Sequence, residues 1–139
     1  MKKLLFLLFP IISFAQNTKQ IEALKLQNQF RQYHFVDSLK YCDTLALKAQ
    51  KWAEYLASID EIKISEDIFG ENIYRIDKIA ETISVKFNPF LDASIFWATS
   101  IDKTMLAQVI DHSANKIGFG FAENENRYYI VAKYNNLIQ

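Results

Sequence analysis

Few side chains in this sequence have the chemistry of a catalyst or a metal ligand, and those few are widely spaced. The two histidines are His34 and His112. His34 falls in a predicted loop between two helices, and His112 follows a predicted strand in which its neighbour Asp111 would point to the opposite face. We therefore expect solvated or core-edge imidazoles, and no metal or catalytic centre built from these residues.

The single cysteine, Cys42, has no partner with which to close an internal disulfide. A lone cysteine most often behaves as a small buried hydrophobe, and the neighbours of Cys42 do not supply a set of metal ligands. We expect the domain to be held together by its apolar core alone.

The first fifteen residues have the composition of a secretory leader. Lys2 and Lys3 give a positive start, residues 4–12 are largely apolar, and Ser13-Phe14-Ala15 places small residues at the two positions that a signal peptidase reads. The apolar run is shorter than the roughly 20 residues that span a bilayer, so a membrane anchor is the less favoured alternative. The sequence predicts cleavage after Ala15, a secreted or periplasmic protein, and a mature domain over residues 16–139 without a transmembrane segment.

Length, composition and charge limit the functions open to this domain. The chain has 139 residues, of which 50% are hydrophobic, and this is enough for one packed domain. Its formal net charge is zero, and loss of Lys2 and Lys3 with the leader leaves a slightly acidic protein. Since no dense run of basic residues is present, nucleic acid is excluded as the expected partner.

The first half of the mature chain has helical patterns. Residues 21–33 are predicted to form a helix that packs through Leu24, Leu26 and Phe30. Asp43 is the predicted N-cap of a second helix. The apolar stripe of that helix has the spacing of one helical face and consists of Leu45, Ala49, Trp52, Ala53 and Leu56.

The second half of the chain turns from helix to strand. Residues 76–87 fit a helical face, although residues 82–87 could equally form a strand, and Asn88-Pro89 interrupts either pattern. Asp92 is the predicted cap of a short helix that carries Ala93, Phe96 and Trp97. A period of two then predicts strands at 106–110, 116–122 and 127–134, separated by turns at 112–115 and 123–126. Helices followed by antiparallel strands indicate an α+β domain with helices packed on a sheet.

The order of these segments resembles the CAP (SCP-like) superfamily of cysteine-rich secretory, antigen 5 and pathogenesis-related proteins. The matching segments are Asn28-Gln29-Phe30-Arg31, Leu39-Lys40-Tyr41, Leu45 to Ala57, Phe69-Gly70-Glu71-Asn72-Ile73-Tyr74, Ala93 with Trp97, Gln108-Val109-Ile110, Ile117-Gly118-Phe119-Gly120 and Val131 to Asn135. The resemblance implies a three-layer α-β-α sandwich and export. The physical reason for Gly118 and Gly120 is that side chains there would crowd whatever packs across the sheet.

The resemblance also shows which site residues this chain has lost. Many family members place two His and two Glu around a cleft that can hold a divalent metal. The first His falls on Ile64 within Ile62-Lys63-Ile64-Ser65, the second on Met105 within Thr104-Met105-Leu106-Ala107, and one Glu on Ser100. Only Glu71 remains. Since Ile and Met offer no ligand suited to zinc, we expect neither a metal nor another cofactor.

The candidate cleft residues are therefore Glu71, Asn72, Ile64, Ser100 and Met105. Glu71 has two interpretations, a polar anchor for a ligand or a carboxylate bonded to nearby backbone, and the second is favoured because an unpaired buried carboxylate is costly. The connection over residues 98–105 is short, so we expect a shallow cleft with an apolar floor at Ile64, Met105 and Leu106.

Three functions remain open from the sequence. The favoured one is an exported, non-catalytic binding module for a protein or a lipid-like partner. The alternatives are a hydrolase with a residual site around Glu71, Asp67 and His112, and a structural surface protein that would expose aromatic residues such as Tyr128 and Tyr129.

Overall fold

The computed structural model describes residues 9–79 and 87–138. The elements follow one another as α1 (Phe9–Tyr33), β1 (Lys40–Tyr41), α2 (Asp43–Ile59), β2 (Phe69–Asp77), α3 (Pro89–Thr99), α4 (Lys103–Val109), β3 (Lys116–Glu123) and β4 (Arg127–Leu137). The predicted helices at 21–33 and from residue 43, and the predicted strands at 116–122 and 127–134, are confirmed. The predicted leader falls partly outside the described residues and partly in the first turns of α1.

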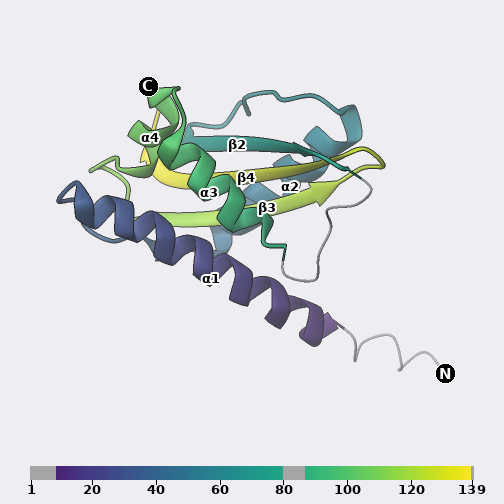
Figure 1. The fold of residues 1–139 in the computed structure, drawn as a ribbon, viewed down its shortest axis with the longest axis horizontal. Helices are drawn as coiled ribbons and strands as arrows, with labels where there is room; N and C mark the ends of the chain where they lie inside the picture. Colours follow the sequence, from purple (N-terminus) through teal and green to yellow (C-terminus); the bar gives the residue numbers. More distant parts are fainter. Residues whose placement is uncertain (1–8, 80–86, 139) are drawn as a thin grey trace.

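The strands form one sheet in the order β1-β3-β4-β2. β4 pairs antiparallel with both β2 and β3, and the two-residue β1 runs parallel to β3. Helix α2 covers one face of the sheet, and α1, α3 and α4 gather on the other (Figure 1). The result is the three-layer α-β-α arrangement that the family resemblance implies. No helix within the described ranges is long and apolar enough to cross a membrane.

Alternate residues of β4 contribute to two separate cores. Tyr129 and Val131 pack under α2 with Ala49, Ala53 and Leu56. Ile130, Ala132 and Tyr134 face the other helices, together with Trp97 and Phe119. Trp97 is fully buried, and its indole nitrogen donates to the Ile73 carbonyl at 3.1 Å. Trp52 is only half-buried, and its indole donates to the Lys63 carbonyl at 2.9 Å.

Close contact between α2 and β3 explains the two glycines of β3. A Cβ atom at Gly118 would lie 2.1 Å from the Ala46 nitrogen, and one at Gly120 would lie 2.2 Å from the Ala49 carbonyl carbon. Backbone atoms of a helix cannot yield by that much without displacing the helix. The prediction that side chains at these positions would crowd the packing across the sheet is confirmed.

Two predicted caps are wrong. Helix α2 begins one residue earlier than expected, with Cys42 at the N-cap and no side-chain cap bond. Asp92 lies within α3, whose N-cap is Asn88. The Asn88 Oδ1 atom accepts from the Phe90 and Leu91 nitrogens at 3.1 and 3.2 Å, so the same Asn-Pro pair that breaks the preceding segment also starts the helix.

Two predicted elements also need correction. Residues 106–110 are not a strand, because the Asp102 side chain accepts from the Thr104 nitrogen and starts the seven-residue helix α4. The third antiparallel strand is instead β2, which includes Ile76, so a helix over 76–87 is wrong at its start. Residues 80–86 lie outside the described ranges. Short apolar segments do not distinguish helix from strand by periodicity, which explains both errors.

Candidate functional site

Two polar residues of α1, Asn28 and Arg31, bind the backbone of the segments around the end of that helix. The Asn28 amide pairs with both backbone groups of Leu39, at 2.7 and 3.1 Å. Arg31 is fully buried and donates to four carbonyl oxygens, which belong to Asp37, Val109, Asp111 and Ala114. Burial lowers the pKa of the Arg31 guanidinium. The pair ties the end of α1 to the chain segments that follow α1 and α4, so its role in the fold is structural.

Glu71 lies on the sheet face that α2 covers, opposite Lys133 of β4 in the register. The Lys133 ammonium is 2.8 Å from the Glu71 Oε1 atom and 2.8 Å from the Asp67 Oδ2 atom, and it also donates to the Ser65 hydroxyl. The Ser65 nitrogen donates to Glu71 Oε2 at 3.0 Å. We call Ser65, Asp67, Glu71 and Lys133 the Lys133 cluster. The backbone bond that the structural interpretation of Glu71 required is present.

The Lys133 cluster is closed to solvent at its centre. The side chains of Lys133 and Glu71 are 1% and 4% exposed, and that of Asp67 is 32% exposed. Glu71 Oε1 has the ion pair as its contact but no hydrogen bond of good geometry. Partial burial raises the pKa of Asp67, but hydrogen bonds from Lys133 and the Phe69 nitrogen outweigh it, and the net shift is downward.

The other predicted cleft residues do not join Glu71. Asn72 faces the opposite side of the sheet and donates to the Met105 carbonyl of α4 at 3.0 Å. Ser100 ends α3, and its hydroxyl accepts from the Asp102 nitrogen. Ile64 is 75% exposed, so it is no part of a cleft floor. The expected apolar floor of Ile64, Met105 and Leu106 is wrong, because Ile64 is exposed to solvent. Glu71 and Asn72 do not share a cleft either, because alternation along β2 places them on opposite faces of the sheet.

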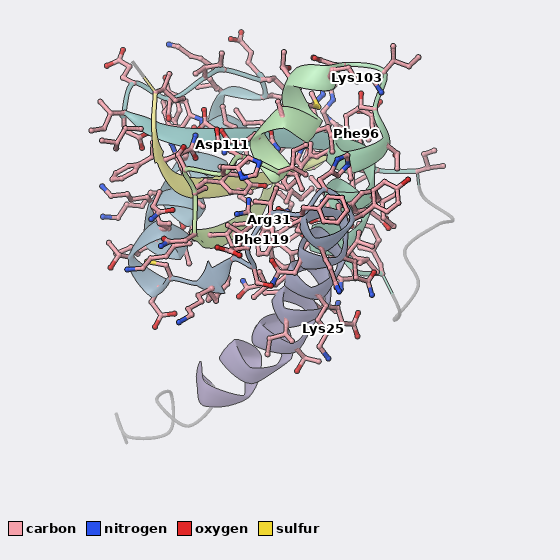
Figure 2. All side chains as sticks on the ribbon, turned by 90° about the vertical axis from the view of Figure 1, so that its left-hand side faces the viewer. Lys25, Arg31, Phe96, Lys103, Asp111 and Phe119 are labelled. Atoms are coloured by element: carbon pink, nitrogen blue, oxygen red, sulfur yellow. The ribbon has the colours of Figure 1, made fainter. Side chains whose placement is uncertain are left out.

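The two histidines instead line one cavity between the end of α1 and the turn after α4. The cavity measures about 620 Å³, and the residues that line it are His34, Val36, Ala107, Ile110, Asp111, His112 and Ser113. Asp111 Oδ1 accepts from the Ser113 nitrogen at 2.7 Å. Figure 2 shows Asp111 and Arg31 at this end of the molecule, where Arg31 donates to the Asp111 carbonyl.

The expectation that Asp111 and His112 face apart is wrong, because residues 111–113 form a turn and not a strand. Sequence reasoning missed this cavity, since nothing in the local pattern brings His34 beside a turn 78 residues later. The sequence feature most closely connected with the cavity is the pair Asn28 and Arg31, whose side chains bind the backbone on both sides of it.

A model of the CAP family of cysteine-rich secretory proteins matches residues 24–134. This chain belongs to the CAP family. The match spans most of the described residues, including both walls of the histidine-lined cavity and the Lys133 cluster.

Solved CAP-like structures share the fold at low sequence identity. MpPR-1i has a TM-score of 0.63 and 23% identity, with 88% of this chain and 90% of that chain covered. Hookworm platelet inhibitor has a TM-score of 0.64 and 18% identity, with coverage of 86% and 70%. An outer surface protein from Borrelia burgdorferi has a TM-score of 0.60 and 14% identity, with coverage of 86% and 93%. No curated protein sequence matches the chain significantly.

The metal site known from other CAP proteins does not fit the residues present here. A further similar structure, with a TM-score of 0.56, was solved with Zn²⁺. At the two positions where the family resemblance expects His, the present chain carries Ile64 and Met105, and its Glu71 is paired with the Lys133 ammonium. Within the described ranges, no group of three or more His, Cys, Asp or Glu side chains is arranged to hold a metal ion.

The structure also bears on the two alternative functions. Asp67 and Glu71 are held by Lys133, whereas His112 lines the cavity beside α1, so the proposed hydrolase residues do not form one site. Tyr128 and Tyr129 are 6% and 0% exposed and belong to the two cores. They do not form the exposed aromatic surface that a structural surface protein would display.

Proposed function

We propose that this CAP protein is an exported, non-catalytic binding module for a protein or lipid-like partner, and that it uses no metal. The observation that carries the proposal is the Lys133 cluster. Glu71, the last of the four family site residues, already has a cation beside it in the Lys133 ammonium. A divalent ion at the same carboxylate would have to displace a buried positive charge.

The Lys133 cluster also argues against hydrolysis. Ser65 and Lys133 are hydrogen-bonded and could be taken for a nucleophile and its base. The Lys133 ammonium is already paired with two carboxylates at 2.8 Å, and it donates to the Ser65 hydroxyl. Lys133 therefore lies beside Ser65 as a hydrogen-bond donor within an ion-pair cluster, which is not the arrangement of a nucleophile and a free base.

Binding is better supported at the end of α1 than at Glu71. Two cavities of about 620 and 440 Å³ lie there and share His34, and both are within the size range of ligand pockets. Export is supported by the leader-like residues 1–15, and a similar structure is described as an outer surface protein.

Native mass spectrometry of the protein from an exporting host tests the proposal. We expect the mass of residues 16–139, either bare or with an organic adduct, and no stoichiometric metal. A bound zinc or calcium mass that disappears in Glu71→Gln would overturn the metal-free site, and an uncleaved chain retained in the cytoplasm would overturn export. A His34→Ala, His112→Ala double variant is the control for metal held elsewhere.

A further inference from the structure

The outer edge of β2 is one of the two borders of the sheet, because β2 comes last in the strand order β1-β3-β4-β2 (Figure 1). In an antiparallel pair, every second residue exchanges backbone hydrogen bonds with the partner strand. The Lys78 nitrogen donates to the Asn126 carbonyl at 2.8 Å, which continues this exchange just beyond β2. The even-numbered residues of β2 therefore bond to β4, and the backbone groups of Ile73, Arg75 and Asp77 point to the outer edge.

This outer edge has almost no hydrogen-bond partners within the described residues. The Trp97 indole donates to the Ile73 carbonyl at 3.1 Å. The Ile73 nitrogen and both backbone groups of Arg75 and Asp77 have no partner in the described ranges. Arg75 and Asp77 are exposed, so solvent reaches this half of the edge.

The opposite border of the sheet is closed by side chains. Beyond the short strand β1, the Gln50 amide pairs with both backbone groups of Phe121, at 2.7 and 2.9 Å. The Tyr41 hydroxyl accepts from the Phe119 nitrogen at 3.5 Å. Unpaired strand edges invite another strand, and proteins usually block them. This protein blocks the edge of β3 and leaves the edge of β2 open.

One face of the open edge carries a cation without an acidic partner. Arg75 and Asp77 lie on the face that α2 covers, because side chains alternate along a strand. The Asp77 carboxylate is 2.9 Å from the Arg127 guanidinium. Arg75 lies beside the Tyr129 hydroxyl, but it belongs to none of the ion pairs of the described residues. A carboxylate from another molecule would therefore meet a guanidinium that has none.

The other face of the open edge carries apolar side chains. Tyr74 stacks on Phe96 of α3, with ring centroids 4.5 Å apart. Phe96 is 38% exposed, and its neighbour Ile95 is 43% exposed. Ile76 is half-buried on the same face as Tyr74. A strand laid along the edge would cover part of this apolar area.

We infer that β2 receives an extended segment of a partner protein as an additional strand of the sheet. A polypeptide backbone supplies donors and acceptors at the spacing of those of Arg75 and Asp77, and lipid chains do not. The bound segment places an acidic residue beside Arg75 on one face and apolar residues towards Phe96 on the other. The edge is separate from the two cavities at the end of α1, so the inference goes beyond the proposed function.

Charge favours a different protein over a second copy as the occupant. A second copy would offer Arg75 only the acidic residues of its own β2. These are Glu71 and Asp77, which are already paired with Lys133 and Arg127 at 2.8 and 2.9 Å. A different protein can bring a carboxylate that has no such partner.

Hydrogen exchange, followed by NMR on the exported protein, first tests whether the edge is open. The amides of Arg75 and Asp77 should exchange at least about 10-fold faster than those of Tyr74 and Ile76, which bond to β4. Equal protection of the two sets would overturn the inference, because it would show that the edge of β2 is already paired.

A short synthetic peptide then tests occupancy of the edge. In this probe, isoleucine and valine alternate with threonine and one central glutamate, and its binding should slow exchange at Arg75 and Asp77. N-methylation of every second residue removes the donors that face β2 and should abolish binding, whereas N-methylation of the residues between should change the affinity less than about 3-fold. No binding at millimolar peptide, or equal effects of the two methylated forms, would overturn the inference.

Arg75→Pro and Arg75→Ala separate the backbone from the side chain. Proline removes an N–H that points away from β4, so the fold should persist while peptide binding is lost. Arg75→Ala keeps the N–H and should weaken binding up to about 5-fold, as for an exposed ion pair. Should Arg75→Pro fail to fold, the two methylated peptides still decide on the wild type.

Two results with these variants would contradict the inference. One is a peptide that binds folded Arg75→Pro as tightly as it binds the wild type. The other is a wild-type dimer that Arg75→Pro converts to a monomer in analytical ultracentrifugation, since a second copy would then occupy the edge.

Discussion

The Lys133 cluster and the end of α1 differ in how far their side chains are paired and buried. In the cluster, two carboxylates and a hydroxyl surround one buried ammonium, and the central side chains are almost completely removed from water. At the end of α1, Phe35 and Tyr33 project into solvent beside an open cavity. The Lys133 cluster is internally satisfied, and the exposed apolar surface lies elsewhere.

This difference separates a part of the molecule whose charges are already paired from a part that leaves apolar area exposed. Ion pairs that are already complete offer little to a ligand, because any new partner must first displace an old one. An exposed aromatic residue can bury apolar area against a partner, and no charged group has to be removed from water. We therefore expect changes in the Lys133 cluster to lower the stability of the fold more than changes at the exposed residues of the end of α1.

The largest effect should come from Lys133→Met. It leaves Glu71 buried beside no cation, and loss of one partner of a buried ion pair destabilises by about 3–5 kcal/mol. Urea unfolding of the wild type and the variant measures the difference. Adding Glu71→Leu to Lys133→Met should recover most of the loss, because Asp67 can remain hydrated. A single variant that loses less than about 1 kcal/mol would show that the pair contributes little.

Arg31→Met should rank second, with a loss of about 2–4 kcal/mol, since it leaves several buried carbonyl oxygens without a donor. The loss should be local as well as global. Hydrogen exchange should increase over residues 109–114, whose carbonyls Arg31 holds, more than over β4. Uniform exchange along the chain would instead indicate that Arg31 does not organise this end of the molecule.

Phe35→Gly should have a smaller effect of opposite sign. Phe35 follows the last turn of α1 in a Schellman motif, with a φ of 60° in the left-handed region. Removing the side chain from a left-handed position relieves about 1–2 kcal/mol, and part of this is offset by the greater freedom of glycine in the unfolded chain. We expect a net gain of about 0.5–1 kcal/mol in the free energy of unfolding. A net loss would show that the exposed ring contributes to the fold after all.

The smallest effect should appear in acid. The pKa of Asp67 is lowered in the folded protein from its ordinary value of 3.8. Its contribution to the free energy of unfolding is therefore complete above that ordinary value, and it is lost as the pH falls through the lower folded value. Asp67→Asn should therefore flatten the decline of the melting temperature below about pH 4 and leave its shape near pH 7 unchanged. An equally steep decline in the variant would assign acid sensitivity to other carboxylates.

Elements with a long regular pattern of apolar residues can be predicted from the sequence. The stripe of α2, the alternation of β3 and β4, and the two glycines at their contact all express packing that repeats along the chain. The short helix α4 was mistaken for a strand because seven residues of mixed polarity carry no decisive period. The exposed end of α1 was not predicted, because a Schellman motif without glycine has no sequence signature.

The candidate site was predicted less well than the fold for a related reason. Family positions identify Glu71, but its partner Lys133 follows from the register of β2 on β4, which no local pattern reveals. The same register sends Asn72 to the other face, towards Met105. Residues that share a family role therefore need not share a site once the surrounding side chains have changed.

Titration of zinc into the purified protein, followed by calorimetry, tests most directly the proposal that the Lys133 cluster leaves no room for a metal ion at Glu71. We expect no saturable binding that depends on Glu71, and identical traces for the wild type and Glu71→Gln. Binding of one zinc ion per chain that is lost in Glu71→Gln, and retained when His34 and His112 are both replaced by Ala, would contradict this account.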